Sequence, residues 1–264
     1  MYRSSDGGAS WTVVNSGLGD RDVWALAVSG ASLLAGTWGG GVFRSQDDGA
    51  SWAAANAGLA SPYVQAYAIG ASGMFAGTGG GGVFRSTDDG ASWTPASAGL
   101  DNPNVLSLVD DGGNLFAGTD GGGVYRSSDD GATWTAASTG LTNRYVLALA
   151  AMSGSVFAGT RGAGVFRTSD AGGRWSPIIT GLGNLDVWAL APVGSDVYAG
   201  TDGGVYVTTS MGGNWTAVNS GLADRRVRAL VLHGGILYAG TEGGGVWRLR
   251  LPTSPALAAS RLPS

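Results

Sequence analysis

The sequence contains no cysteine, no lysine, one histidine (His233) and one glutamate (Glu242). Without cysteine the chain forms neither disulfides nor thiolate metal sites, and a single histidine excludes a histidine triad or a histidine-rich metal site. Charged residues make up only 13% of the chain, and the net charge is −4. A weakly acidic chain without a basic stripe is not expected to bind nucleic acid. No apolar run is long enough to span a bilayer, so we expect no membrane insertion.

Glycine and tryptophan are abundant, with 49 and 10 copies, and six of the tryptophans recur at a nearly constant interval. Residues 86–93 read STDDGASW, and this octapeptide occurs six times. The copies end at Trp11, Trp52, Trp93, Trp134, Trp175 and Trp215. The intervals are 41, 41, 41, 41 and 40 residues, which is the signature of a repeat protein. Within each copy, Ser and Asp side chains accept hydrogen bonds from nearby backbone N–H groups and Gly supplies a positive φ, which predicts a hairpin corner.

Each period contains four short apolar segments separated by glycine-rich turns, without a helical repeat of apolar residues. In the first period the predicted strands span residues 11–14, 23–28, 32–36 and 41–45. The second of these segments is apolar on both faces, which is expected of an innermost strand packed between neighbouring sheets. Its equivalents are residues 64–69, 105–110, 146–151, 187–192 and 227–232.

This pattern predicts an all-β six-bladed β-propeller of four-stranded antiparallel blades over residues 1–251. The third-strand sequence occurs both at residues 2–4 and at residues 246–248, so one copy is redundant in a six-blade ring. We expect the ring to close by joining the N-terminal strand around Trp11 to the C-terminal strands, which removes an open sheet edge. Which third strand is displaced stays open. Residues 252–264, with three prolines, are expected to be a disordered tail or linker.

The repeated Ser-x-Asp-x-Gly-x-Ser/Thr-Trp motif resembles the Asp-box, or bacterial neuraminidase repeat (BNR), of sialidase-like, sortilin-like and photosystem II assembly factor-like propellers. Copies one to four match it in full, the fifth has Thr168 and Arg174, and the sixth has Ser210 in place of Asp. The resemblance implies a structural corner remote from any active site. No catalytic role is therefore assigned to the corner aspartates, of which Asp88 is one.

Comparison of the repeats shows which positions the scaffold leaves free. These positions follow the Ala-Gly-Thr segment, precede the inner strand or form its second residue. They lie in the loop from the fourth strand of one blade to the first strand of the next and in the loop from the second strand to the third. In an up-and-down blade these two loops emerge at one mouth of the central channel. Loops on a rigid scaffold commonly carry binding residues. The candidate ligand-binding residues are Arg21, Asp22, Trp24, Trp38, Tyr63, Asn104, Asp120, Tyr145, Arg161, Asp186, Trp188, Asp202, Arg226, Arg228 and Glu242.

Two interpretations of these positions stay open. Free loop positions drift, but solvated turns favour Ser, Asn and Asp over Trp, Tyr and Arg, and aromatic and arginine side chains dominate binding energy. If the ring closes, Arg21, Arg225, Arg226 and Arg228 cluster and suit an anionic group. Alternatively, neighbouring carboxylates neutralise them. Those carboxylates are Asp20, Asp22, Asp224 and Glu242.

We predict a non-catalytic module that binds a glycan or protein at this mouth, without cofactor or metal. One alternative is a sialidase-like glycoside hydrolase, but sialidases as a family place their catalytic groups in long insertions, and these repeats have none. Another is an architectural repeat of a larger surface or secreted protein. The sequence opens inside a repeat, so we expect a monomeric piece of a longer, exported chain, extracellular or at the cell surface.

Overall fold

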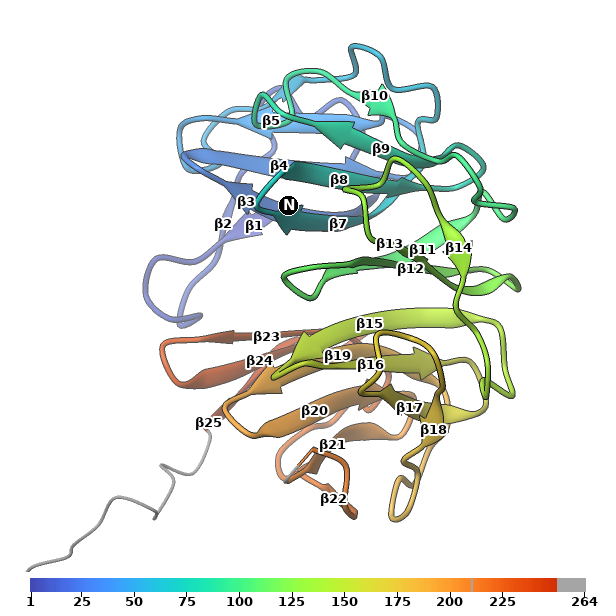
Figure 1. Cartoon of the computed structure of the whole chain (residues 1–264). Helices are drawn as coiled ribbons and strands as arrows, with labels where there is room; N and C mark the ends of the chain where they lie inside the picture. Colours follow the sequence, from blue (N-terminus) through green and yellow to red (C-terminus); the bar gives the residue numbers. More distant parts are fainter. Residues whose placement is uncertain (210, 251–264) are drawn as a thin grey trace, which may run out of the picture.

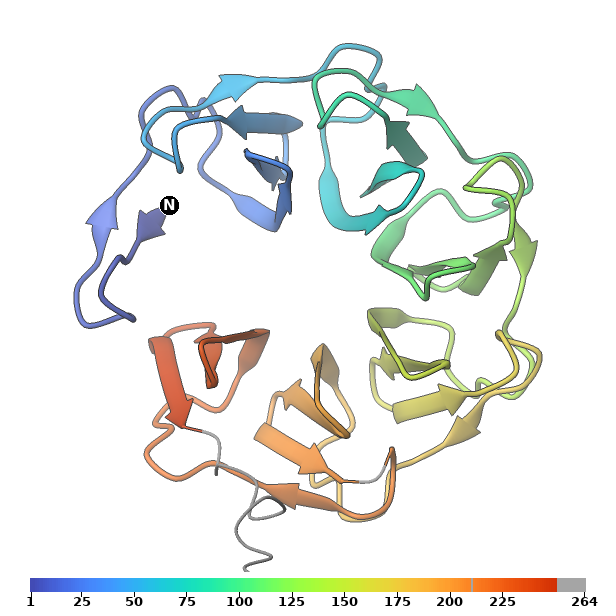
Figure 2. The same ribbon diagram turned by 60° about the vertical axis from the view of Figure 1, so that its left-hand side comes forward.

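The computed structural model describes residues 1–209 and 211–250, with the side chain of Arg250 left out. It confirms an all-β propeller of six blades built on a four-stranded antiparallel plan, and the described residues contain no helix. The sheets are arranged in a ring around one axis (Figure 2), and Figure 1 labels their strands. The predicted C-terminal tail, residues 252–264, and Ser210 lie outside the described residues.

The blades share one strand order, from the innermost strand outward. The innermost strands are β3 (Val23–Ser29), β7 (Val64–Gly70), β11 (Val105–Asp110), β15 (Val146–Met152), β19 (Val187–Val193) and β23 (Val227–His233). The second strands are β4 (Ser32–Thr37), β8 (Gly73–Thr78), β12 (Leu115–Thr119), β16 (Ser155–Thr160), β20 (Asp196–Thr201) and β24 (Ile236–Thr241).

The outer strands follow in the same order. The third strands are β1 (Tyr2–Arg3), β5 (Val42–Ser45), β9 (Gly82–Ser86), β13 (Gly123–Ser127), β17 (Gly164–Thr168), β21 (Gly204–Thr208) and β25 (Gly245–Arg250). The fourth strands are β2 (Thr12–Val13), β6 (Ala53–Ala54), β10 (Thr94–Pro95), β14 (Thr135–Ala136), β18 (Ser176–Pro177) and β22 (Trp215–Ala217). Five blades have all four strands, and β23–β25 form a blade of three described strands.

The predicted closure is wrong. Strands β1 and β2 pair with each other in a separate two-stranded sheet, and β25 takes the third-strand place beside β24. The ladder between β24 and β25 joins six residue pairs, from Ile236 with Arg250 to Thr241 with Gly245, whereas β1 is only two residues long. The C-terminal copy is therefore the third strand of the sixth blade, and the N-terminal copy lies outside that blade. Figure 2 shows the β1–β2 sheet between the first and last blades.

Contacts between blades use the repeated small and apolar residues. Gly36 of the Ala-Gly-Thr segment lies so close to Val64 of the next blade that an added Cβ would be 2.6 Å from a Val64 methyl carbon. The corner tryptophan of the next repeat fills the outer part of the interface. Trp93, for example, is 2% exposed, and its indole N–H donates to the Ala55 carbonyl at 3.1 Å. The invariant residues are therefore those that join the blades.

Candidate functional site

The structure brings the two variable loops together on one face. The backbone N–H of Trp38, in the turn between the second and third strands, donates to the Asp22 carbonyl, just before the inner strand of the same blade, at 2.9 Å. Trp38 also forms a β-bridge with Tyr63 of the next blade. The same bridge joins Asp120 to Tyr145 and Arg161 to Asp186. We call this face the mouth and define it by the fifteen candidate residues named above.

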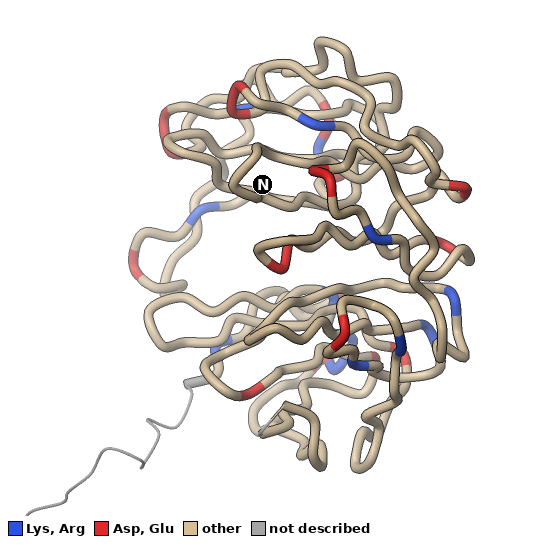
Figure 3. Tube along the Cα trace, in the orientation of Figure 1, with Lys and Arg blue, Asp and Glu red and all other residues tan. Residues whose placement is uncertain are grey.

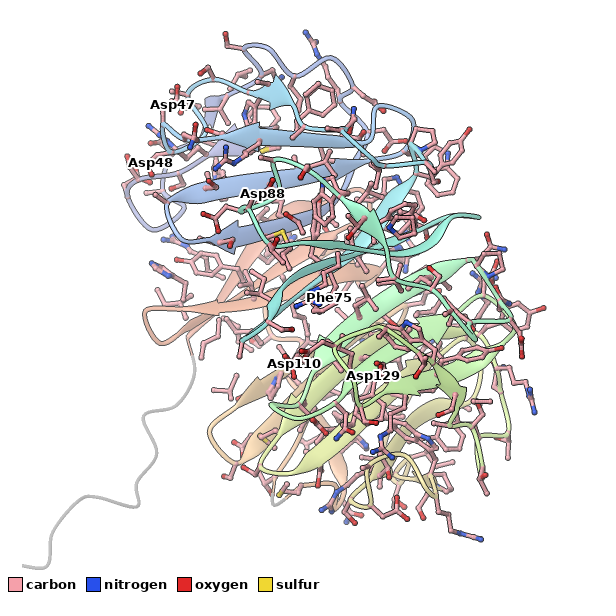
Figure 4. The ribbon with its side chains drawn as sticks, turned by 45° about the horizontal axis from the view of Figure 1, so that its top comes forward. Asp47, Asp48, Phe75, Asp88, Asp110 and Asp129 are labelled. Carbon is pink, nitrogen blue, oxygen red and sulfur yellow. The ribbon has the colours of Figure 1, made fainter. Side chains whose placement is uncertain are left out.

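The corners lie on the opposite face. The Ser29 hydroxyl, at the turn between the first two strands of the first blade, donates to Asp89 of the next corner at 2.9 Å. The corner aspartates Asp47 and Asp88 lie on one side of the molecule in Figure 4. The predicted separation of structural corners from the variable loops is thus reproduced.

The corner carboxylates have a structural role. Asp88 accepts hydrogen bonds from the Ser92 hydroxyl at 2.6 Å, the Ser92 backbone N–H at 2.9 Å and the Ser86 hydroxyl at 2.8 Å. These hydrogen bonds, that from the Ser92 side chain above all, lower the pKa of Asp88 to about 2. A carboxylate held this firmly in its ionised form is a poor general acid. The same pattern lowers the pKa of Asp47 and Asp129 to about 2.

A β-bulge at the start of every inner strand positions one mouth residue. In the first blade, Val23 pairs with Thr37 and Ala25 with Gly36, which leaves Trp24 as the extra residue. The equivalent extra residues are Gln65, Leu106, Leu147, Trp188 and Arg228. Bulges redirect side chains and recur next to functional sites. Comparison of the repeats showed that these positions vary, but it did not reveal the bulge. The inner strands are too short for one added residue to be recognised from the alternation of their apolar side chains.

Three aromatic side chains form one part of the mouth, which we call the aromatic platform. The rings of Trp24 and Trp38 stack with centroids 4.7 Å apart and planes 28° apart. Tyr63 lies tilted against Trp38 at 5.2 Å. The three residues are 55%, 43% and 40% exposed, so the platform presents aromatic surface to solvent. The Trp24 indole N–H donates to the Asp22 carboxylate at 3.1 Å, which fixes the orientation of this ring.

An arginine cluster forms a second part, from the fourth to the sixth blades. The Arg228 guanidinium carbon lies 4.2 Å from the centroid of the Trp188 ring, and that of Arg161 lies 5.9 Å from it. Arg161 also lies 5.5 Å from the ring centroid of Tyr145. Such distances allow cation–π attraction. Arg161 and Tyr145 are exposed, whereas Trp188 is half-buried beneath the cations.

Carboxylates pair with Arg228 of this cluster and with the nearby Arg226, as the second interpretation of the sequence proposed for the sixth repeat. Arg228 pairs with both Asp202 and Glu242. Arg226 pairs with Glu242 at 3.0 Å and with Asp224 at 3.4 Å. The predicted gathering of Arg21 with these arginines depended on ring closure, which the structure does not form.

The remaining candidates lie on the mouth without entering either group. Asn104 and Asp120 are exposed and belong to the third blade, where the backbone N–H of Asp120 donates to the Asn104 carbonyl at 3.0 Å. In the view of Figure 3, segments with charged residues of either sign are few and scattered along the described trace. Among the described residues, no group of three or more His, Cys, Asp or Glu side chains is arranged to hold a metal ion. The described part of the chain has no helix that could cross a membrane.

Residues 74–184 match the family described as the DUF6242 beta propeller domain. No curated protein matches the chain. Among solved structures, the chain is similar to the extracellular domain of BT4673 from B. thetaiotaomicron, with a TM-score of 0.70 and 17% identity over 92% of this chain and 34% of that one.

Two glycoside hydrolases are also similar in structure. An ancestral GH74 enzyme matches with a TM-score of 0.70 and 20% identity, over 90% of this chain and 37% of that one. The GH74 xyloglucanase from Xanthomonas campestris matches with a TM-score of 0.58 and 21% identity, over 83% and 35%. The chain spans about a third of the length of these three proteins. At such identities the likeness shows the fold alone, that of a β-propeller.

Proposed function

We propose that the protein is a non-catalytic binding module that holds a glycan at the mouth, with the aromatic platform as the main contact. The observation that carries this proposal is the exposed, stacked pair of Trp24 and Trp38 with Tyr63 beside it. Large aromatic rings supply apolar contact area with little loss of conformational entropy. A sugar ring presents an apolar C–H face that stacks on such rings, while its hydroxyl groups stay in solvent.

The arginine cluster supports the same proposal by offering polar contacts elsewhere on the mouth. Arg161 is exposed, and its guanidinium is held over Tyr145 and Trp188. It has five N–H donors for hydroxyl or carboxylate oxygens. An aromatic surface with a few fixed polar groups is a common composition for a small-molecule site. The extracellular neighbour from B. thetaiotaomicron is in keeping with a module that works outside the cell.

A glycoside hydrolase is the second candidate, because GH74 enzymes share the fold. Hydrolysis of a glycosidic bond commonly needs one protonated and one ionised carboxyl group flanking the substrate. At this mouth, Asp202 and Glu242 are both engaged by Arg228. Both carboxylates are thus occupied by ion pairs within the protein rather than free to flank a substrate. We therefore favour binding without turnover.

The test is a glycan-array screen of the purified protein that includes xyloglucan oligosaccharides, run beside hydrolysis of the same sugars and of a fluorogenic sialoside. Binding without turnover is expected. Trp38→Ala should weaken binding at least tenfold and change the unfolding free energy by less than about 0.5 kcal/mol, the usual range for surface substitutions. Trp11→Ala is the matched control, because Trp11 is 44% exposed but lies on a corner.

Each other result has a distinct meaning. Turnover of any sugar would contradict a non-catalytic module. A large loss of stability in Trp38→Ala would place this residue in the scaffold and remove the platform as a binding surface. The absence of both binding and turnover across the array would contradict a glycan ligand and favour a protein ligand or an architectural repeat.

A further inference from the structure

The β1–β2 sheet occupies the ring position that follows the sixth blade. Its contacts repeat those between other successive blades. The Arg248 guanidinium donates to the Gly7 carbonyl at 2.9 Å, just as Arg3 donates to the Asp48 carbonyl of the next corner at 2.8 Å. An added Cβ at Gly8 would lie 3.5 Å from the Tyr238 ring. The corner glycine of the second blade likewise lies against the second strand of the first blade.

The sixth blade has no fourth strand among the described residues. In the preceding blades this strand begins at the corner tryptophan, whose indole N–H donates to a carbonyl one repeat earlier. Trp134 donates to Ala96 at 2.8 Å, and Trp215 donates to Ile178 at 2.6 Å. The next carbonyl in this series is that of Val218. This residue lines a pocket of about 240 Å³ that Trp247, Arg248 and Leu249 of β25 also line. We call this pocket the open socket.

The open socket matches the missing side chain in chemistry. Its lining includes Val218, Leu222, Leu237, Trp247 and Leu249, which makes it mainly apolar, as a tryptophan ring requires. It continues the row of interfaces in which the corner tryptophans are at most 5% exposed from Trp52 onward. By contrast, Trp11, on the β1–β2 corner, is 44% exposed.

In the part of the chain that the structure describes, the position after the sixth blade also has no first or second strand. Strand β1 pairs only with β2 in the described chain, although every other third strand pairs with a second strand. On β3, Leu26 and Val28 face this position and are each 62% exposed. On β23, Val231 is 59% exposed, whereas its equivalent Ala68 is 6% exposed against the third blade.

The glycine of the last Ala-Gly-Thr segment, Gly240, indicates independently that an inner strand is missing beside the sixth blade of the described chain. An added Cβ at Gly36, Gly77, Gly118, Gly159 or Gly200 would lie 2.6–2.7 Å from a methyl carbon of the inner-strand valine of the next blade. At Gly240 the nearest atom is Ala229 Cβ of its own blade at 3.5 Å. The valine that would pack on Gly240 belongs to the missing inner strand.

The three missing strands are consecutive in the repeat: the fourth strand of one blade, then the first and second of the next. We propose that this open sector binds a partner segment with the sequence pattern of these repeats, which supplies all three strands and places a tryptophan in the open socket. The segment pairs by β-strand addition with the edges of β25 and β1 that have no partner strand among the described residues. In this mode backbone hydrogen bonds give affinity and a pocket gives specificity. Residues 251–264 contain no tryptophan, so they lack the anchor.

The probe is a peptide of residues 92–119 of this chain, which carries Trp93 and spans β10, β11 and β12. We expect it to bind the full chain with 1:1 stoichiometry in titration calorimetry and to raise the unfolding midpoint. The same peptide with Trp93→Ala should bind at least tenfold more weakly. In the chain, Leu249→Arg should prevent binding of the unchanged peptide, with circular dichroism confirming that the variant folds.

Two further measurements make the outcome decisive. Fusion of residues 92–119 to the C-terminus of the full chain should raise its unfolding midpoint, whereas the fusion with Trp93→Ala should not. Trp38→Ala should leave peptide binding unchanged, so failure of the glycan proposal is separate from failure of this one. The absence of an effect in both formats, or equal effects of both peptides, would overturn the proposal. Self-association of the chain that Trp11→Ala abolishes would overturn it in favour of a second copy.

Discussion

Replacement of Trp134 by alanine tests whether the corner tryptophans join the blades. Trp134 is 3% exposed and packs in a cluster with Phe75, Ala96, Val105 and Leu115. Its indole N–H donates to the Ala96 carbonyl at 2.8 Å. Truncation removes the buried ring and leaves a cavity, for which large-to-small aromatic substitutions in a core cost about 3–5 kcal/mol. We expect a loss of this size.

The matched variant is Trp11→Ala, which changes the same position of the repeat where the side chain is 44% exposed. Its expected cost is within about 0.5 kcal/mol. Trp134→Phe separates the two contributions in the buried case, because it keeps an aromatic ring but leaves the Ala96 carbonyl without its donor. That loss of one buried hydrogen bond is expected to cost about 1–3 kcal/mol.

The assay is equilibrium unfolding in guanidinium chloride, monitored by the circular dichroism of the β-sheet at one wavelength. Fluorescence is unsuitable as the probe because removal of a tryptophan changes the fluorescence signal itself. Equal losses in Trp134→Ala and Trp11→Ala would refute the reasoning. Such a result would mean that Trp11 is buried in solution, as in a ring closed through the N-terminal strand. A small loss in Trp134→Ala would show that the corner tryptophans do not hold neighbouring blades together.

Three further predictions concern the scaffold and the mouth. Gly58→Ala should destabilise the protein far more than Gly154→Ala. Both glycines have positive φ, but an added Cβ at Gly58 would lie 2.0 Å from a carbonyl oxygen, whereas an added Cβ at Gly154 would meet open space. Paired denaturation curves measure the difference, and equal losses of stability would contradict the prediction. The carboxyl group of Asp88, titrated by NMR, should show a pKa of about 2. Because its folded pKa lies below the ordinary value of 3.8, its stabilising effect should be complete above about pH 4 and be lost as the pH falls toward 2; an ordinary pKa would contradict the corner geometry. Arg228→Met should lower the unfolding free energy by less than about 1 kcal/mol, since its ion pairs are partly exposed and such pairs contribute little; a larger loss in thermal denaturation would mark Arg228 as part of the scaffold.

The blade could be predicted from the sequence because its determinants are local and repeated. A corner motif, an inner strand apolar on both faces and an Ala-Gly-Thr segment recur at one interval, so each copy supports the assignment of the others. The inner strand predicted at residues 105–110 has those bounds in the structure. Because successive strands of a blade run in opposite directions, the variable loops could also be predicted to lie on one face. Only their binding role remains a prediction.

Closure of the ring and the shape of the mouth could not be predicted in this way. Of the two copies of the third strand, β25 pairs with β24 and β1 pairs only with β2 in the described chain. The sequence shows both copies but not how far either one pairs. Likewise, stacking of Trp24 on Trp38 depends on a bulge that turns the side chain of Trp24. These features arise from tertiary geometry, which the period does not encode.

The mouth and the scaffold use different atoms, and this separation explains how the mouth can vary. The blades are joined by the packing of glycine on valine and by the hydrogen bond from a corner tryptophan to a backbone carbonyl. Neither contact includes an exposed side chain of the mouth. At the mouth, the two variable loops of a blade are joined through backbone bonds such as that from Trp38 N–H to the Asp22 carbonyl. A backbone bond is indifferent to side-chain identity, so substitution there changes the surface offered to a ligand. Variation at Trp38 should therefore change binding without loss of the fold.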